Sequence, residues 1–293
     1  MKFIDDATLA RIKSFKYSGL NVNSESLLSG EHPSRSRKGI SQEFAEYRHY
    51  AIGDDTRFID WKVYAKRDRL FIKEFIEEKA AVIHFLADAS GSMNFKGSGA
   101  AFSKWEYSAR LLMSLACLCF IKGDYCGLYC MSGSLNREIP PGASLKHAAF
   151  FDSVLEKTNP SGDSIPLEDL KLYVSKMEKN SVLVVFSDLM FESEKIASIS
   201  AIIGTKKIRT YVFHVIDGFE KDIPWKGPLT FLDMETNVEM PIVPDYVRDS
   251  YNAEFSKWLK LCKTLYTTPR TRYFPAFTDM RIDGIIEKFI TLT

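Results

Sequence analysis

The sequence lacks any apolar run long enough to cross a membrane. Its longest apolar stretch, residues 111–121, falls well short of the roughly 20 residues that a spanning helix needs. Residues 1–13 mix acidic, basic and apolar side chains, without the apolar core of a secretion signal. We therefore expect a cytoplasmic protein that does not insert directly into a membrane.

The chain also lacks an excess of charge of either sign. Its 293 residues include 39 basic and 38 acidic side chains, which gives a formal net charge of +1. No overall field therefore favours nucleic acid or an anionic membrane. The short basic patches at 35–38 and 66–69 lie among acidic residues, so we expect solvated surface there, with nucleic-acid binding as the alternative.

Sequence motifs for common catalytic and cofactor sites are missing too. The five cysteines include no Cys-x-x-Cys pair, which argues against zinc, and four of them lie in apolar runs, as buried thiols do. There is no Gly-x-x-x-x-Gly-Lys phosphate-binding loop and no Gly-x-Ser-x-Gly elbow. His84 and His214 fall inside apolar runs and are expected in the core. The sequence therefore predicts a protein that is not an enzyme, with a metal-dependent hydrolase as the alternative.

The chain does contain an alternation of strand and helix patterns. Apolar runs at 81–87, 181–186 and 209–216 are typical of buried strands, and the segments between them place apolar residues at helical spacing. This alternation predicts an α/β fold with a mostly parallel, doubly wound, Rossmann-like sheet.

Two domains are expected from the change in composition. Residues 1–78 read as an N-terminal arm and a small, aromatic and charged, β-rich subdomain. Residues 79–293 read as the α/β domain, with a hairpin and a long helix inserted near 221–268.

Polar side chains follow two of the predicted strands. Asp88, Ser90 and Ser92 come directly after one strand, and Asp188 comes after another. Ligands of open α/β sheets bind beyond the carboxyl ends of the strands, so we expect these four side chains to meet. Their oxygen atoms suit a hard cation, Mg²⁺ or alternatively Mn²⁺ or Ca²⁺. A helix cap or an Asx-turn is the alternative interpretation.

The stretch Asp88-Ala89-Ser90-Gly91-Ser92-Met93 resembles the metal-ion-dependent adhesion site (MIDAS) of von Willebrand factor type A domains. The resemblance implies a von Willebrand factor type A-like fold and one more oxygen ligand from a loop after the central helices. That loop is residues 160–165 here, and either Asp163 or Ser164 takes the position where such sites usually have threonine. The ion would keep an open position for a carboxylate of a partner protein.

Motifs on both sides of this site resemble a bacterial family catalogued as domain of unknown function fifty-eight. They include Gly53-Asp54-Asp55-x-Arg57 and Ile59-Asp60-Trp61 upstream and Leu232-x-x-Glu235-Thr236 downstream. The resemblance implies an adaptor that works with a MoxR-type AAA+ ATPase and a client protein. Most such proteins carry membrane helices before the aromatic segment, so this chain is similar to the soluble form.

The upstream segment has two interpretations. Its charges either form a structural network that holds the β-rich subdomain together, or they form a surface where a partner docks. The candidate docking residues are Arg48, Asp54, Asp55, Arg57, Asp60 and Trp61.

Overall fold

The computed structural model describes residues 1–15, 42–77, 80–133, 135–162, 165–206, 208–221, 224–234 and 238–292. The chain divides into two compact units. The smaller unit spans residues 28–80, and the larger one combines residues 1–27 with residues 81–293.

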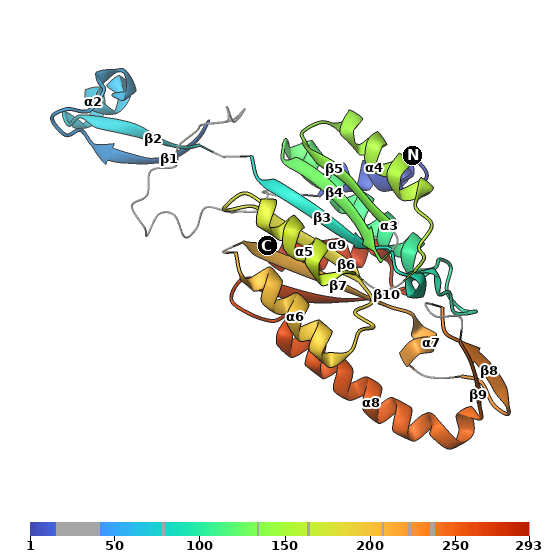
Figure 1. The fold of residues 1–293 in the computed structure, drawn as a ribbon. Helices are drawn as coiled ribbons and strands as arrows, with labels where there is room; N and C mark the ends of the chain where they lie inside the picture. The colour runs from blue at the N-terminus through green and yellow to red at the C-terminus, as the bar shows by residue number, and fades with distance from the viewer. Residues whose placement is uncertain are drawn as a thin grey trace. The chain divides into compact units, whose positions relative to one another are not determined.

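The larger unit is built on a six-stranded sheet with the order β10-β7-β6-β3-β4-β5 (Figure 1). All neighbouring strands are parallel except β5, which pairs antiparallel with β4. The expected α/β class with a mostly parallel, doubly wound sheet is therefore confirmed. The strands are β3 (Val82–Asp88), β4 (Tyr125–Ser132), β5 (Leu135–Gly142), β6 (Val182–Ser187), β7 (Arg209–Ile216) and β10 (Thr271–Phe277).

Helices cover both faces of this sheet. Successive strand residues point to opposite faces, so Phe85 packs in one core cluster and Leu86 in the other. The first face packs against α1 (Asp6–Ser14), α3 (Lys104–Lys122), α4 (Leu145–Lys157) and α9 (Ile282–Leu292). The second face packs against α5 (Leu167–Lys176), α6 (Ser193–Gly204) and α8 (Pro244–Leu265). Coverage of both faces explains why the central strands are almost wholly apolar.

Several short elements connect these layers. A 3₁₀ turn, η2 (Gly91–Asn94), follows β3, and α7 (Gly218–Lys221) follows β7. A hairpin of β8 (Leu229–Leu232) and β9 (Glu239–Ile242) leads into α8. All five cysteines are buried and none forms a disulfide bond. No described helix combines the length and the apolar character that crossing a bilayer requires.

The N-terminal segment belongs to the larger unit, which differs from the sequence-based division at residue 78. Phe3, Ile4 and Ile12 are buried in the core cluster that contains α3. The carboxylate of Asp152, on α4, accepts hydrogen bonds from the backbone N–H groups of Lys2 and Phe3 at 2.8 and 3.1 Å. The physical reason is apolar burial, because the spaced apolar residues of this segment complete one face of the core.

The smaller unit contains the antiparallel pair β1 (Gln42–His49) and β2 (Phe71–Glu77). Between them lie a 3₁₀ turn, η1 (Thr56–Phe58), and the short helix α2 (Trp61–Arg67). Asp60 caps α2, since its carboxylate accepts hydrogen bonds from the N–H groups of Lys62 and Val63. Asp68 ends the helix in the left-handed region, at φ 52°.

Replacing Ile12 by alanine tests the docking of the N-terminal segment. Because Ile12 is 1% exposed, we expect Ile12→Ala to lower the free energy of unfolding by about 2–4 kcal/mol. Leu172→Ala, at a side chain that is 56% exposed, should change it by less than about 0.5 kcal/mol. Urea titration followed by circular dichroism measures both values, and equal small effects would mean that the segment is only loosely attached.

Candidate functional site

The candidate site lies where the chain leaves two neighbouring strands in opposite directions. β3 and β6 are adjacent, yet the chain continues from β3 to β4 on one side and from β6 to β7 on the other. Such a switch point opens a crevice at the carboxyl ends of the strands, where α/β proteins bind ligands. Asp88 ends β3, and Asp188 directly follows β6.

Hydrogen bonds bring the four predicted residues together. The Asp88 carboxylate accepts hydrogen bonds from the Ser90 N–H at 3.0 Å and from the Ser187 hydroxyl at 2.6 Å. The hydroxyl oxygens of Ser90 and Ser92 lie 3.2 Å apart, and the Ser92 side chain hydrogen-bonds to Asp188. Two carboxylates and two hydroxyls therefore converge, as the sequence predicts.

Most of this cluster is closed to solvent. Asp88 and Ser90 are fully buried and Asp188 is 1% exposed, whereas Ser92 is half-buried. Ser92 is therefore the most exposed of the four side chains.

The loop at 160–162 lies against the loop that follows β3. The Gly91 N–H donates to the Gly162 carbonyl at 3.0 Å, and the Ser161 N–H donates to the Ala89 carbonyl at 2.9 Å. The proposed fifth ligand, Asp163 or Ser164, lies outside the described residues.

Gly91 is needed because another segment approaches it closely. A Cβ atom at this position would overlap the backbone carbonyl oxygen of Met234, at the end of the β8 side of the hairpin. The segment after β8 therefore borders the candidate site, which the spacing of the motifs alone does not reveal. Only glycine permits this backbone contact.

Sequence reasoning missed one charged residue of the site, Lys104. Its ammonium group lies 2.7 Å from a carboxylate oxygen of Asp188 and also bonds to the Glu220 carboxylate. The lysine side chain is 1% exposed. A lysine in the first turn of a helix is disfavoured by the helix dipole, and this was the one signal available in the sequence.

Burial and charge act differently on the two aspartates. Burial first, and then the neighbouring Asp188 charge, raises the pKa of Asp88 to about 7. Burial also tends to raise the pKa of Asp188, but the Lys104 ammonium outweighs it and holds that pKa below its ordinary value. The site therefore contains one carboxylate paired with a cation and one that faces its negative neighbour.

His214 lies beside the site, and both of its ring nitrogens are hydrogen-bonded. The ring nitrogens of His214 pair with the Asp188 carbonyl oxygen at 2.7 Å and with the Tyr273 hydroxyl at 2.6 Å. Burial lowers the pKa of His214 to about 4, so the ring is neutral near pH 7. His84 is also buried in the sheet and bonds to the Tyr173 hydroxyl at 3.1 Å.

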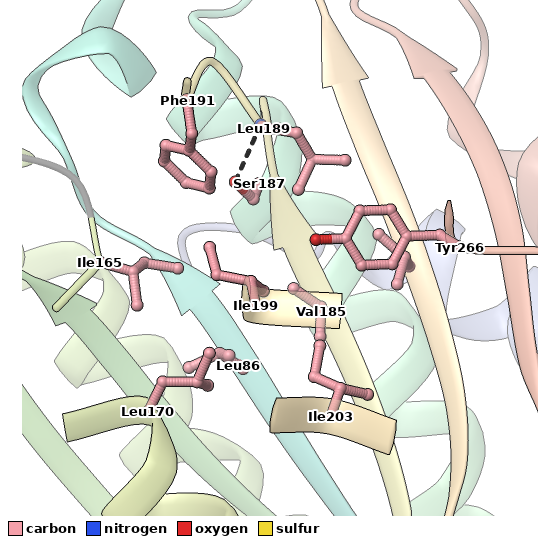
Figure 2. Close-up of a pocket in the computed structure, with 11 residues that line it drawn as sticks. Leu86, Ile165, Leu170, Val185, Ser187, Leu189, Phe191, Ile199, Ile203 and Tyr266 are labelled. Atoms are coloured by element: carbon pink, nitrogen blue, oxygen red, sulfur yellow. Dashed lines mark hydrogen bonds between the residues drawn. The ribbon is translucent and has the colours of Figure 1, made fainter. Parts of the chain in front are cut away.

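A small apolar cavity lies on the face of the sheet that α5 and α6 cover (Figure 2). Ser187 lines it and accepts a hydrogen bond from the Leu189 N–H at 3.0 Å. The volume of about 10 Å³ is no larger than a single water molecule requires. This cavity therefore has no room for an organic substrate.

The donor set fits a hard divalent cation. No group of three or more His, Cys, Asp or Glu side chains placed to hold a metal occurs within the described ranges, so hydroxyls have to complete the shell. Asp88, Ser90 and Ser92 supply hard oxygen donors, and a dication beside them would offset the repulsion between Asp88 and Asp188. Asp188 is shared with the Lys104 ammonium.

The candidate docking residues of the smaller unit form local pairs. Arg48 bonds to Asp54 at 2.9 Å, and Arg57 bonds to Asp55 at 2.6 Å. Asp60 accepts a hydrogen bond from the Tyr47 hydroxyl at 3.0 Å in addition to capping α2. These contacts match the structural network, whereas a docking role stays a prediction. The Trp61 side chain is 61% exposed.

Residues 46–258 match the family described as Protein of unknown function DUF58. The chain belongs to the DUF58 family. The resemblance inferred from the motifs is thereby confirmed, and no curated protein matches the sequence.

Solved structures similar to this DUF58 protein include three with low sequence identity. The conserved hypothetical protein BatB from Bacteroides thetaiotaomicron is 15% identical over 73% of this chain and 100% of its own, with a TM-score of 0.46. An aerotolerance-related membrane protein from Bacteroides fragilis is 16% identical over 73% and 100%, with a TM-score of 0.43. The SpRpn10 VWA domain is 9% identical over 71% and 95%, with a TM-score of 0.43.

The raised pKa of Asp88 predicts a pH dependence in metal-free buffer. Its folded pKa of about 7 lies above the ordinary value of 3.8, so the native state keeps a proton that the unfolded state loses between these values. The contribution of Asp88 to the free energy of unfolding should therefore be largest below about pH 4 and decline as the pH rises toward 7. Relative to Asp88→Asn, the wild type should lose a few kcal/mol over this range, since a tenfold difference in proton affinity between the two states corresponds to about 1.4 kcal/mol.

Urea titrations of both proteins in chelator, from acid to neutral pH, measure this difference. The difference between the two curves isolates Asp88, because every other titrating group is common to both proteins. Parallel curves would show that the Asp88 carboxyl is not perturbed.

Proposed function

We propose that this DUF58 protein is a non-enzymatic interaction module that binds a partner protein through a divalent cation at the carboxyl-terminal edge of its sheet. The observation that carries the proposal is the convergence of Asp88 and Asp188 with the hydroxyls of Ser90 and Ser92 at the switch point. Mg²⁺ is the proposed ion, with Mn²⁺ or Ca²⁺ as alternatives of the same hard type.

Each side chain has a defined part in this proposal. Ser90 and Ser92 offer neutral oxygens, and Asp88 and Asp188 offer negative charge, directly or through water. Asp163 or Ser164 is the proposed fifth ligand. The bound cation supplies a Lewis-acidic position for a carboxylate of the partner.

The state of the histidine beside the site supports a binding role over catalysis. The histidine beside the site, His214, is buried, neutral and held by two hydrogen bonds. A metal-dependent hydrolase needs a group that takes a proton from water, and the Asp88 carboxyl, whose pKa is raised to about 7, is the candidate for that role under this alternative. Loss of a measured hydrolysis in Asp88→Ala would favour the hydrolase instead.

The proposed partner is a MoxR-type AAA+ ATPase that acts on a client protein. This part of the proposal rests on membership of the family and on the resemblance of its motifs. A second candidate interface lies on the smaller unit, where Ile52, Phe58 and Trp61 are 101%, 47% and 61% exposed. Exposed aromatic side chains are frequent anchors of protein interfaces.

Metal binding predicts a thermal shift. At a concentration ten times its dissociation constant, Mg²⁺ or Mn²⁺ should stabilise the wild type by roughly 1.4 kcal/mol, which corresponds to an increase in Tm of about 3 °C. Asp88→Ala should abolish the shift. Asp249→Ala, which removes an exposed carboxylate of α8, should keep it. Differential scanning fluorimetry with and without chelator measures all three proteins.

Partner binding predicts metal-dependent capture. An immobilised wild-type chain should retain a purified MoxR-type ATPase in the presence of Mg²⁺ and lose it in chelator or with Asp88→Ala. Trp61→Ala should bind as well as the wild type. Capture that survives chelator but fails with Trp61→Ala would place the interface on the smaller unit.

A further inference from the structure

A buried ammonium group already occupies part of the candidate metal site. The Lys104 ammonium bonds to Asp188 at 2.7 Å and to Glu220, and it lies 5.8 Å from the centre of the Phe95 ring. The side chains of Lys104 and Asp188 are each 1% exposed, and that of Glu220 is 12% exposed. A cation in this position is shielded from bulk water, so its charge acts strongly on its neighbours.

The surrounding structure holds the ammonium in place from two sides. Glu220, on α7, accepts a hydrogen bond from the Asp217 N–H at 2.8 Å through its second oxygen. Asp217 in turn accepts bonds from the Gly97 N–H at 3.1 Å and from the Thr278 hydroxyl at 3.0 Å. These contacts tie α7 to the segment before α3. The ion pairs of Lys104 with Asp188 and Glu220 offset the unfavourable position of a lysine at a helix N-terminus.

The Asp188 carboxylate cannot serve two cations equally well. One oxygen bonds to the ammonium, and the other accepts the Met190 N–H at 3.2 Å. A dication beside Asp88, Ser90 and Ser92 would lie close to the ammonium, and like charges repel strongly at such separations in a buried site. Coordination through the oxygen that bonds to the ammonium would displace the ammonium, and coordination through the other oxygen would bring the dication close to it.

We propose that Lys104 is a built-in cation of this site, which neutralises Asp188 in the metal-free protein and competes with a divalent ion for that carboxylate. This inference rests on the proposed metal site. It identifies Lys104 as the residue that limits the affinity of the site for a divalent cation. Glu220 is the second partner to which the ammonium stays bonded when Asp188 turns to the metal. The wild type is therefore a weak metal binder whose site is already closed without metal.

Two variants test the competition. Lys104→Met removes the charge and keeps the length of the side chain. Lys104→Met combined with Glu220→Gln removes one positive and one negative charge, so the cluster keeps the net charge of the wild type while Asp188 is released. Isothermal titration of Mg²⁺ and of Mn²⁺ into each protein should show binding that is on the order of tenfold tighter, or more, in both variants.

The double variant separates release of Asp188 from a change in total charge. It also protects the test against misfolding, because Lys104→Met alone leaves two buried carboxylates without a cation. Circular dichroism in chelator reports folding, and the increase in Tm on adding metal should be larger in both variants than in the wild type.

Lys206→Met is the matched control. Lys206 precedes β7, and its ammonium bonds to the backbone carbonyls of Ser175 and Met177, so the variant loses the same charge at a different place. It should bind metal as the wild type does. Equal affinities in the wild type and both Lys104 variants would overturn the inference and leave the metal site standing. Lack of metal binding in all four proteins would overturn the metal site itself.

Discussion

Negative charge buried at the ends of two adjacent parallel strands is the constraint on which the site depends. β3 and β6 bring Asp88 and Asp188 to one edge of the sheet, and the core on both faces leaves neither carboxylate room to reach bulk water. Burial without a cation is costly. The two carboxylates are stabilised in different ways. Asp188 pairs with the Lys104 ammonium, whereas Asp88 accepts hydrogen bonds from Ser90 and Ser187.

The contacts around the two carboxylates connect elements that are distant in the chain. Lys104 opens α3, Glu220 lies on α7, and Asp217 anchors the intervening backbone to the segment around Gly97. The Met234 carbonyl approaches Gly91 closely, so the segment after β8 also lies beside the candidate site. A change in the charge at the switch point would therefore act on several segments that are distant in the chain.

The smaller unit handles charge in a different way. Its ion pairs, Arg48 with Asp54 and Arg57 with Asp55, are short-range in sequence and partly exposed, so each contributes little to stability. They shape the turns around the α2 cap at Asp60 while Trp61 stays exposed. The larger unit thus keeps its charged cluster buried, whereas the smaller unit has exposed ion pairs and exposed aromatic side chains.

The sequence by itself determined the fold class and the strands that carry the site. It also determined that the side chains of Asp88, Ser90, Ser92 and Asp188 meet at one edge of the sheet. Strand and helix periodicity is a local property, and parallel strands bring their carboxyl ends to one edge whatever the details of packing. Only the tertiary structure decided that the N-terminal helix completes the core and that Lys104 pairs with Asp188. Both depend on contacts between residues far apart in the chain, and no local pattern specifies which distant carboxylate a buried ammonium will meet.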